Sequence, residues 1–127
     1  MAATAALQRI DKSRRNVRRL FRISFTGSYA NSGTTGDVVD MTLATNPNNL
    51  ERALLSEIPG SNRFILTHVN LPGYVVMMSI GTALASLLGI RIFQSDDAVD
   101  PLDEIANGVY AAAITAGYVD VMIESRW

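Results

Sequence analysis

The alternation of hydrophobic and polar positions predicts a chain built mainly from β-strands. Phe21, Ile23 and Phe25 recur at a spacing of two, which places them on one face of a strand over residues 20–26. The same reasoning predicts five further strands, over residues 37–43, 63–70, 74–80, 90–94 and 118–124. Six strands with turn signals between most of them favour a β-sandwich or a jelly-roll-like domain.

The segments between these strands predict one or two short helices. Val39, Met41 and Leu43 are expected on one face of the second strand, which ends before a turn at Pro47. A helix over residues 50–55 can begin after an asparagine cap. The segment Gly81 to Gly89 fits either a short helix or a wide turn.

The first 19 residues lack a sustained hydrophobic stripe. A short amphipathic helix is one interpretation, but a mobile arm that becomes ordered on binding fits the sparse apolar residues better. The sequence thus predicts an extended basic arm over residues 1–19 and a β-rich domain over residues 20–127. At 127 residues, the length suits one domain.

A run without formal charge extends from Phe64 to Ile90, if His68 is neutral, and is long enough to span a bilayer. Polar residues, Pro72 and glycines interrupt it, so buried strands are the preferred interpretation.

Charge is unevenly distributed along the chain, although the net charge is only -1. Residues 1–22 hold seven basic residues and one acidic residue, whereas the rest holds four basic and eleven acidic residues. This asymmetry indicates electrostatic association. The predicted partner-binding residues are Lys12, Arg14, Arg15, Arg18, Arg19 and Arg22.

Guanidinium groups bind phosphates or carboxylates, so this arm fits either nucleic acid or an acidic protein surface. Nucleic-acid binding predicts interleaved aromatic residues, and only Phe21 is near. A merely solvated tail is a third interpretation. Nucleic acid is therefore the alternative rather than the preferred partner.

No catalytic, cofactor or metal site is predicted. The chain has no cysteine and no phosphate-binding glycine motif. His68 is expected on the same strand face as Phe64 and Leu66, as a partly buried structural residue. The chain has one dense acidic cluster, formed by Asp96, Asp97, Asp100, Asp103 and Glu104. It lacks the spacing of a calcium-binding loop, so we interpret it as a solvated loop.

Methionine and aromatic residues are enriched in protein interfaces. On this ground the residues predicted at an oligomer interface are Tyr74, Met77, Met78 and Trp127, although the same residues fit an ordinary core equally well.

Three segments carry a resemblance to a known family: SFTGSYANSGTTGDVVDMT, LPGYVVMMSI and IRIFQSDDAVDPLDEIANGVYAAAITAGYVDVMIES. Because of these three segments, residues 23–127 resemble a tailed-bacteriophage head protein of the decoration or cement type. The resemblance implies a non-enzymatic, commonly trimeric β-domain without a cofactor. It also implies a place on the outer capsid surface, where the domain binds the major capsid protein and reinforces the head. No membrane association is expected.

Overall fold

The computed structural model describes residues 3–13, 15–29, 37–50, 62–80, 87–94, 103–106 and 108–126. This part of the chain is mainly β, with 70% of it in strands. Its helical segments are a single turn of α-helix, α1 (Ala112–Thr115), and a short 3₁₀ helix (Met41–Leu43). The predicted mainly β class is confirmed, and a β-sandwich-like arrangement agrees with it.

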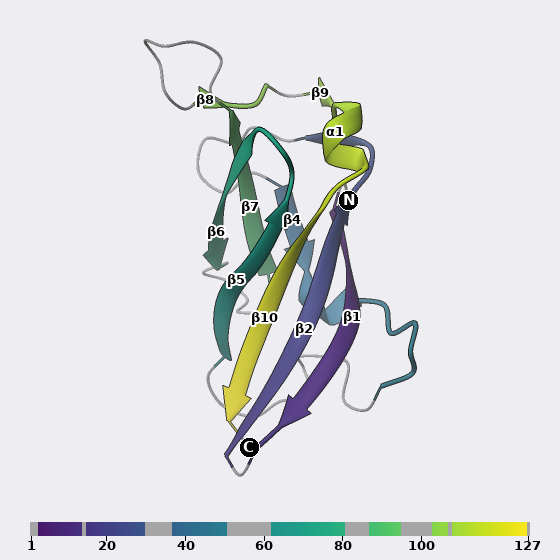
Figure 1. Ribbon diagram of the computed structural model, residues 1–127, viewed down its shortest axis with the longest axis vertical. Helices are drawn as coiled ribbons and strands as arrows, with labels where there is room; N and C mark the ends of the chain where they lie inside the picture. Colours follow the sequence, from purple (N-terminus) through teal and green to yellow (C-terminus); the bar gives the residue numbers. More distant parts are fainter. Residues whose placement is uncertain are drawn as a thin grey trace.

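Two antiparallel sheets carry the fold (Figure 1). The first has the strand order β1 (Ala3–Lys12), β2 (Asn16–Phe25), β10 (Tyr118–Arg126) and β5 (Asn62–Asn70). The second has the order β4 (Asp37–Asp40), β7 (Leu87–Gln94) and β6 (Tyr74–Ile80), and β7 also pairs with β8 (Asp103–Glu104). A two-stranded piece joins β3 (Ser28–Tyr29) to β9 (Gly108–Val109).

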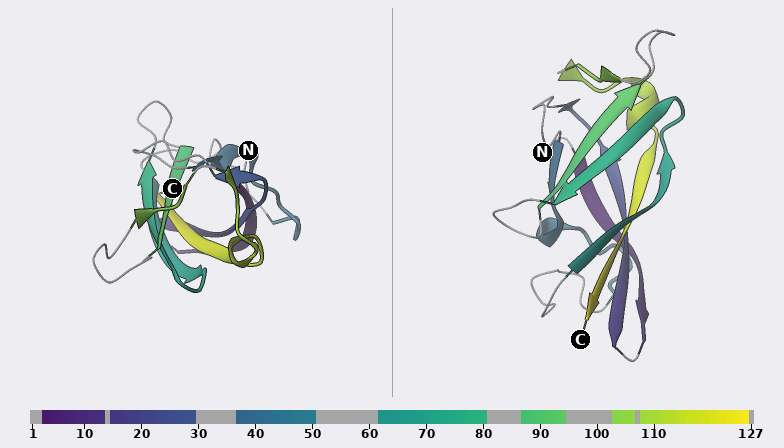
Figure 2. Two further views of the ribbon diagram at one scale, coloured as in Figure 1. Left: turned by 90° about the horizontal axis from the view of Figure 1, so that it is seen from above. Right: turned by 90° about the vertical axis from the view of Figure 1, so that its left-hand side faces the viewer.

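The hydrophobic core lies between the two sheets, which curve around it when the molecule is seen from above (Figure 2). The first sheet contributes Phe21, Ile23 and Val121, and the second contributes Ile90 and Ile92, all fully buried. Each of these residues alternates with a more exposed neighbour, as expected for strands with one face packed on a core.

Residues after β4 connect the second sheet to the first. The amide of Thr45 donates to the carbonyl of Ala5 over 2.9 Å, and the amide of Leu7 donates to the carbonyl of Thr45 over 2.8 Å. These bonds satisfy part of the outer edge of β1, which would otherwise present backbone groups for pairing with another chain.

The expectation of a mobile arm over residues 1–19 is wrong for the residues described. β1 and β2 form an antiparallel hairpin, with Ala5 opposite Ile23 and Leu7 opposite Phe21. Ala3, Ala5 and Leu7 are buried at a period of two. The physical reason is that small alanine side chains fill the core face of an edge strand without forming a conspicuous hydrophobic stripe.

The predicted strands are correct in type but differ at their ends. The first begins at Asn16 rather than residue 20, and the fifth begins at Leu87 rather than residue 90. β4 ends at Asp40, and the 3₁₀ helix that follows leaves Leu43 exposed instead of beside Val39. The predicted helix over residues 50–55 lies outside the described residues except for its first position, as do residues 81–86 of the ambiguous segment.

The long uncharged run contributes to three strands rather than one span. It covers most of β5, all of β6 and the start of β7. Within the described ranges, no helix has the length and apolar character needed to cross a membrane.

Gly117 fixes the junction between α1 and β10. A Cβ at this position would collide with the carbonyl oxygen of Asn70 and would lie 2.7 Å from Cδ2 of Leu71. The absence of a side chain therefore lets the α1–β10 junction pack closely against the end of β5.

Candidate interaction surfaces

The arginines of β2 lie on opposite faces of the first sheet. In a strand consecutive side chains point to opposite faces, so Arg18 and Arg19 are separated by the sheet. Arg18 and Arg22 lie on the outer face, whereas Arg19 is fully buried on the core face, opposite Ile10 and Ile123. The prediction of Arg19 as an exposed partner-binding residue is therefore wrong.

Arg22 forms a bidentate ion pair with Asp120, which lies directly opposite it on β10. Its Nε donates to Oδ1 over 3.0 Å and a terminal nitrogen donates to Oδ2 over 3.3 Å. The hydrogen bond to Asp120 raises the pKa of Arg22 above its ordinary value. The guanidinium also lies 3.7 Å from the centre of the Tyr118 ring, a cation–π geometry.

A second pair continues this pattern along the same two strands. Arg18 lies opposite Glu124, and its Nε donates to Oε2 over 2.8 Å. We call Arg18, Arg22, Asp120 and Glu124 the charged row. In the charged row, two arginines of the basic N-terminal segment are neutralised by acidic residues near the C-terminus, so part of the charge asymmetry of the sequence is used inside the sheet.

The remaining predicted arm residues lie near the turn between β1 and β2. Lys12 and Arg15 are exposed there, while Arg14 lies outside the described residues. Arg9, which the prediction did not include, pairs with Asp11 over 3.0 Å, and both side chains are a little more than half exposed. The structure thus does not gather the five described members of the predicted set into one basic surface.

The second sheet has an apolar outer face. Met77 is 54% exposed and Val75 is 47% exposed, and both alternate with buried or half-buried residues on β6. Val38 on β4 is exposed on the same side, because it pairs with Gly89 of β7. We call Val38, Val75 and Met77 the apolar face.

Of the predicted oligomer-interface residues, only Met77 is well exposed among those described. Tyr74 and Met78 are half-buried and pack against the core, and Trp127 lies outside the described residues. Sequence reasoning missed Val75 because it selected methionine and aromatic residues, and valine is neither. The sequence signal for this surface was the pair of apolar residues Val75 and Met77, which occupy the strand positions that alternate with Tyr74, Val76 and Met78.

A paired charge lies on β7, the strand between β4 and β6. Arg91 lies opposite Met77, donates from Nε to Oε1 of Glu104 over 2.7 Å, and stands 5.0 Å from the centre of the Phe93 ring. The carboxylate that holds this guanidinium is mostly buried, with 8% of the Glu104 side chain exposed.

A β-bulge changes the expected position of His68. The pairing of β5 with β10 shifts between Leu66 and His68, so His68 lies opposite Asp120 on the outer face. His68 is exposed and its ring centre is 5.9 Å from that of Tyr118. The expectation of a partly buried histidine beside Phe64 and Leu66 is wrong, because the extra residue reverses the alternation.

Two members of the acidic cluster, Asp103 and Glu104, form β8, and the other three lie outside the described residues. Where the structure describes the chain, no group of three potential metal-ligating side chains comes together.

Comparison of the chain with models of known families, with curated proteins and with solved structures finds no match. The architecture therefore defines the class of protein only as a mainly β, sandwich-like domain.

Proposed function

We propose that this chain is a structural protein of a tailed-phage head, and that it binds the outer capsid surface and bridges neighbouring capsid subunits. The resemblance of residues 23–127 to decoration proteins supports this proposal. Its partners are the major capsid protein and further copies of the chain, in a trimer. It acts by binding and not by catalysis.

The observation that carries the proposal is the apolar face. Val75 and Met77 expose apolar side chains on β6, and Val38 exposes one on β4, on the other side of β7. Exposed apolar side chains are unfavourable in water, and apolar surface commonly marks a protein interface. Methionine is also enriched in interfaces, where its flexible side chain adapts to a partner. The apolar face is the surface that we assign to the capsid.

The charged row argues against the alternative, a protein that binds nucleic-acid phosphates through its arginines. Arg18 and Arg22 already donate to carboxylates, so a phosphate would have to displace Glu124 and Asp120. Phosphate binding also weakens steeply with salt, whereas apolar docking does not. The two functions therefore predict opposite responses to added salt.

Cosedimentation with capsid shells that lack the chain tests the proposal. The wild-type protein should pellet with the shells at low and at moderate salt. The double variant Val75→Glu/Met77→Glu should remain in the supernatant, because it introduces charge into the docking surface. Leu43→Glu is the matched control, since it changes an exposed apolar residue that lies outside the apolar face.

Retention of the double variant on the shells would remove the apolar face as the docking surface. If the wild-type protein ignores the shells but retards DNA in a gel, and loses this activity as salt rises, the nucleic-acid alternative replaces the proposal.

A further inference from the structure

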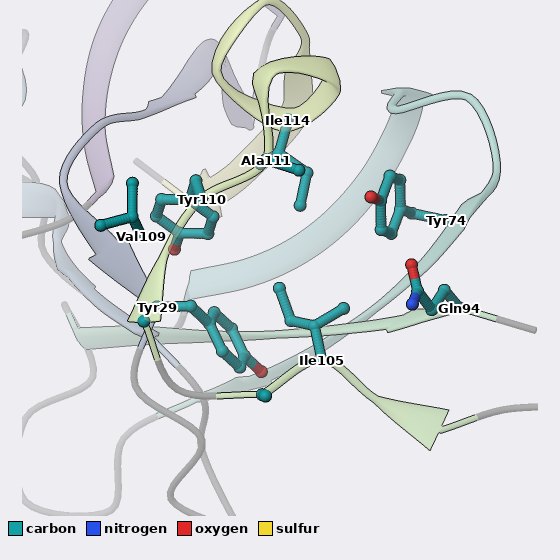
Figure 3. A pocket seen from close by; sticks show the side chains of 10 residues that line it. Tyr29, Tyr74, Gln94, Ile105, Val109, Tyr110, Ala111 and Ile114 are labelled. Atoms are coloured by element: carbon teal, nitrogen blue, oxygen red, sulfur yellow. The ribbon is translucent and has the colours of Figure 1, made fainter. Parts of the chain in front are cut away.

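Met77 lies on the outward side of β6, within the apolar face. Its side chain is 54% exposed, and Val75, two positions earlier on the same side, is 47% exposed. The alternate positions of β6 turn inward, since Val76 is buried and Met78 packs against the core. Tyr74 belongs to this inward set, and Figure 3 shows its ring at the edge of a pocket beside α1. The alternation of side chains along β6 therefore directs Met77 into solvent.

The exposure of Met77 distinguishes it from the other methionines that the structure describes. Met41 is fully buried in the core, whereas Met78 and Met122 are half-buried. Oxidation of a thioether requires access of the oxidant to the sulfur atom, so exposure sets the order of reaction. Among the described methionines, Met77 should react first and Met41 last.

A peroxide is the class of oxidant that acts on this side chain. The sulfur lone pair attacks one oxygen of hydrogen peroxide, so an S–O bond forms while the O–O bond breaks. The proton of the transferred oxygen passes to the departing hydroxide, which leaves as water. Sulfur loses two electrons and the peroxide gains them. The product, methionine sulfoxide, is polar and can be reduced again by methionine sulfoxide reductases.

The position of Met77 gives this reaction a consequence for binding. The other members of the apolar face, Val38 and Val75, are aliphatic and are not oxidised in this way. A sulfoxide at Met77 would place a hydrogen-bond acceptor in the surface that we assign to the capsid. Burial of such a group against an apolar partner, without a donor, is unfavourable.

We propose that Met77 is a site of peroxide oxidation and that its sulfoxide switches off docking through the apolar face. This inference rests on the proposed capsid function and adds redox control to it. Reduction of the sulfoxide restores the apolar face, so the switch is reversible.

The first test uses the free protein and needs no capsid. The full chain is treated with dilute hydrogen peroxide, and tandem mass spectrometry follows the gain of one oxygen atom at each methionine. The oxidised wild-type protein should elute earlier from a hydrophobic-interaction column. Met77→Leu should not shift, because leucine has a similar volume but no sulfur. Met78→Leu is the matched control and should shift as the wild-type protein does.

Cosedimentation with capsid shells then tests the consequence, as the affinity before and after peroxide treatment within each variant. Oxidation should weaken binding of the wild-type protein and of Met78→Leu by about tenfold, the effect of burying an unpaired polar group. It should not change the affinity of Met77→Leu, whatever the starting value. A methionine sulfoxide reductase should restore binding of the oxidised wild-type protein.

Oxidation of Met41 before Met77 would overturn the assigned site. Undiminished binding of protein oxidised at Met77, equal losses in the wild-type protein and Met77→Leu, or a loss that the reductase does not reverse would each overturn the switch. If the untreated wild-type protein does not bind the shells, the proposed function fails and the docking part of the inference fails with it. The oxidation site itself is then decided by the mass spectrometry and the column.

Discussion

The ion pair between Arg22 and Asp120 provides a quantitative test of how the charge asymmetry of the chain is used. The proposed perturbation is a double-mutant cycle with Arg22→Ala, Asp120→Ala and the double variant, followed by urea unfolding. If the charged row holds β2 to β10, the two substitutions should be strongly non-additive. If the arginines are instead free to bind a partner, the coupling should be negligible.

The magnitude follows from the geometry and the burial of the pair. Exposed ion pairs contribute about 0.2–1 kcal/mol, and hydrogen bonds to charged groups contribute about 1.5–3 kcal/mol. The Asp120 side chain is 11% exposed, but Arg22 is 40% exposed, so solvent screens part of the interaction. Two hydrogen bonds with this partial screening give an expected coupling of about 1.5 kcal/mol.

The two single variants should also differ. Removing Arg22 leaves a mostly buried carboxylate without its charged partner, at a cost of about 2 kcal/mol. Removing Asp120 leaves a guanidinium that still reaches water, so this variant should lose less. The contact of Arg22 with Tyr118 is lost in Arg22→Ala in either background, so to a first approximation it cancels from the coupling.

The matched control is the same cycle at Arg9 and Asp11. The Nε–Oδ2 distance of this pair is also 3.0 Å, but the side chains are 59% and 53% exposed. Its expected coupling is about 0.3 kcal/mol. Equal coupling in the two cycles would refute the reasoning, because burial and the second hydrogen bond would then contribute nothing.

Three further predictions concern stability and are measured by urea or thermal unfolding. Gly117→Ala should destabilise the fold by about 2 kcal/mol, because its Cβ meets backbone as well as side-chain atoms; an unchanged midpoint would contradict the close packing at this junction. Arg19→Ala should cost about 3 kcal/mol by leaving a cavity in the core, whereas Arg15→Ala on the exposed turn should change stability by less than about 0.5 kcal/mol. Tyr29→Phe should lower the stability by about 1 kcal/mol, because the hydrogen bond from the Ile92 amide to the Tyr29 hydroxyl is lost. Tyr110→Phe should be neutral or stabilising, because the hydroxyl that it removes is buried without a partner among the described residues. A larger loss of stability in Tyr110→Phe than in Tyr29→Phe would contradict these roles of the two hydroxyls.

Local alternation made most of the fold predictable. Strands such as Tyr74 to Ile80 were bounded correctly because their β-branched and aromatic residues lie between clear turn signals. β1 was missed because its buried positions are alanine and leucine, and alanine carries little hydrophobic signal in a strand. Its pairing with β2 stabilises it, and no local pattern encodes that pairing.

The faces of residues near irregular positions were less predictable. The bulge after Leu66 moves His68 to the outer face, and the 3₁₀ helix after Asp40 moves Leu43 into solvent. A period of two continues only while the ladder is regular, so one inserted residue reverses every later assignment on that strand.

The interaction surfaces depend on contacts between residues far apart in sequence, which explains why the arginines were misjudged. From the sequence, seven basic residues near the N-terminus favour an external acidic or phosphate partner. In the structure, the antiparallel register of β2 and β10 brings Arg18 and Arg22 to carboxylates about one hundred positions away. Because these two charges are paired internally, we expect the proposed partner binding to depend more on burial of the apolar face than on electrostatic attraction. The salt dependence of capsid binding is therefore the measurement that separates the two driving forces: binding that persists at high salt requires the apolar face, and binding that disappears requires charges outside the charged row.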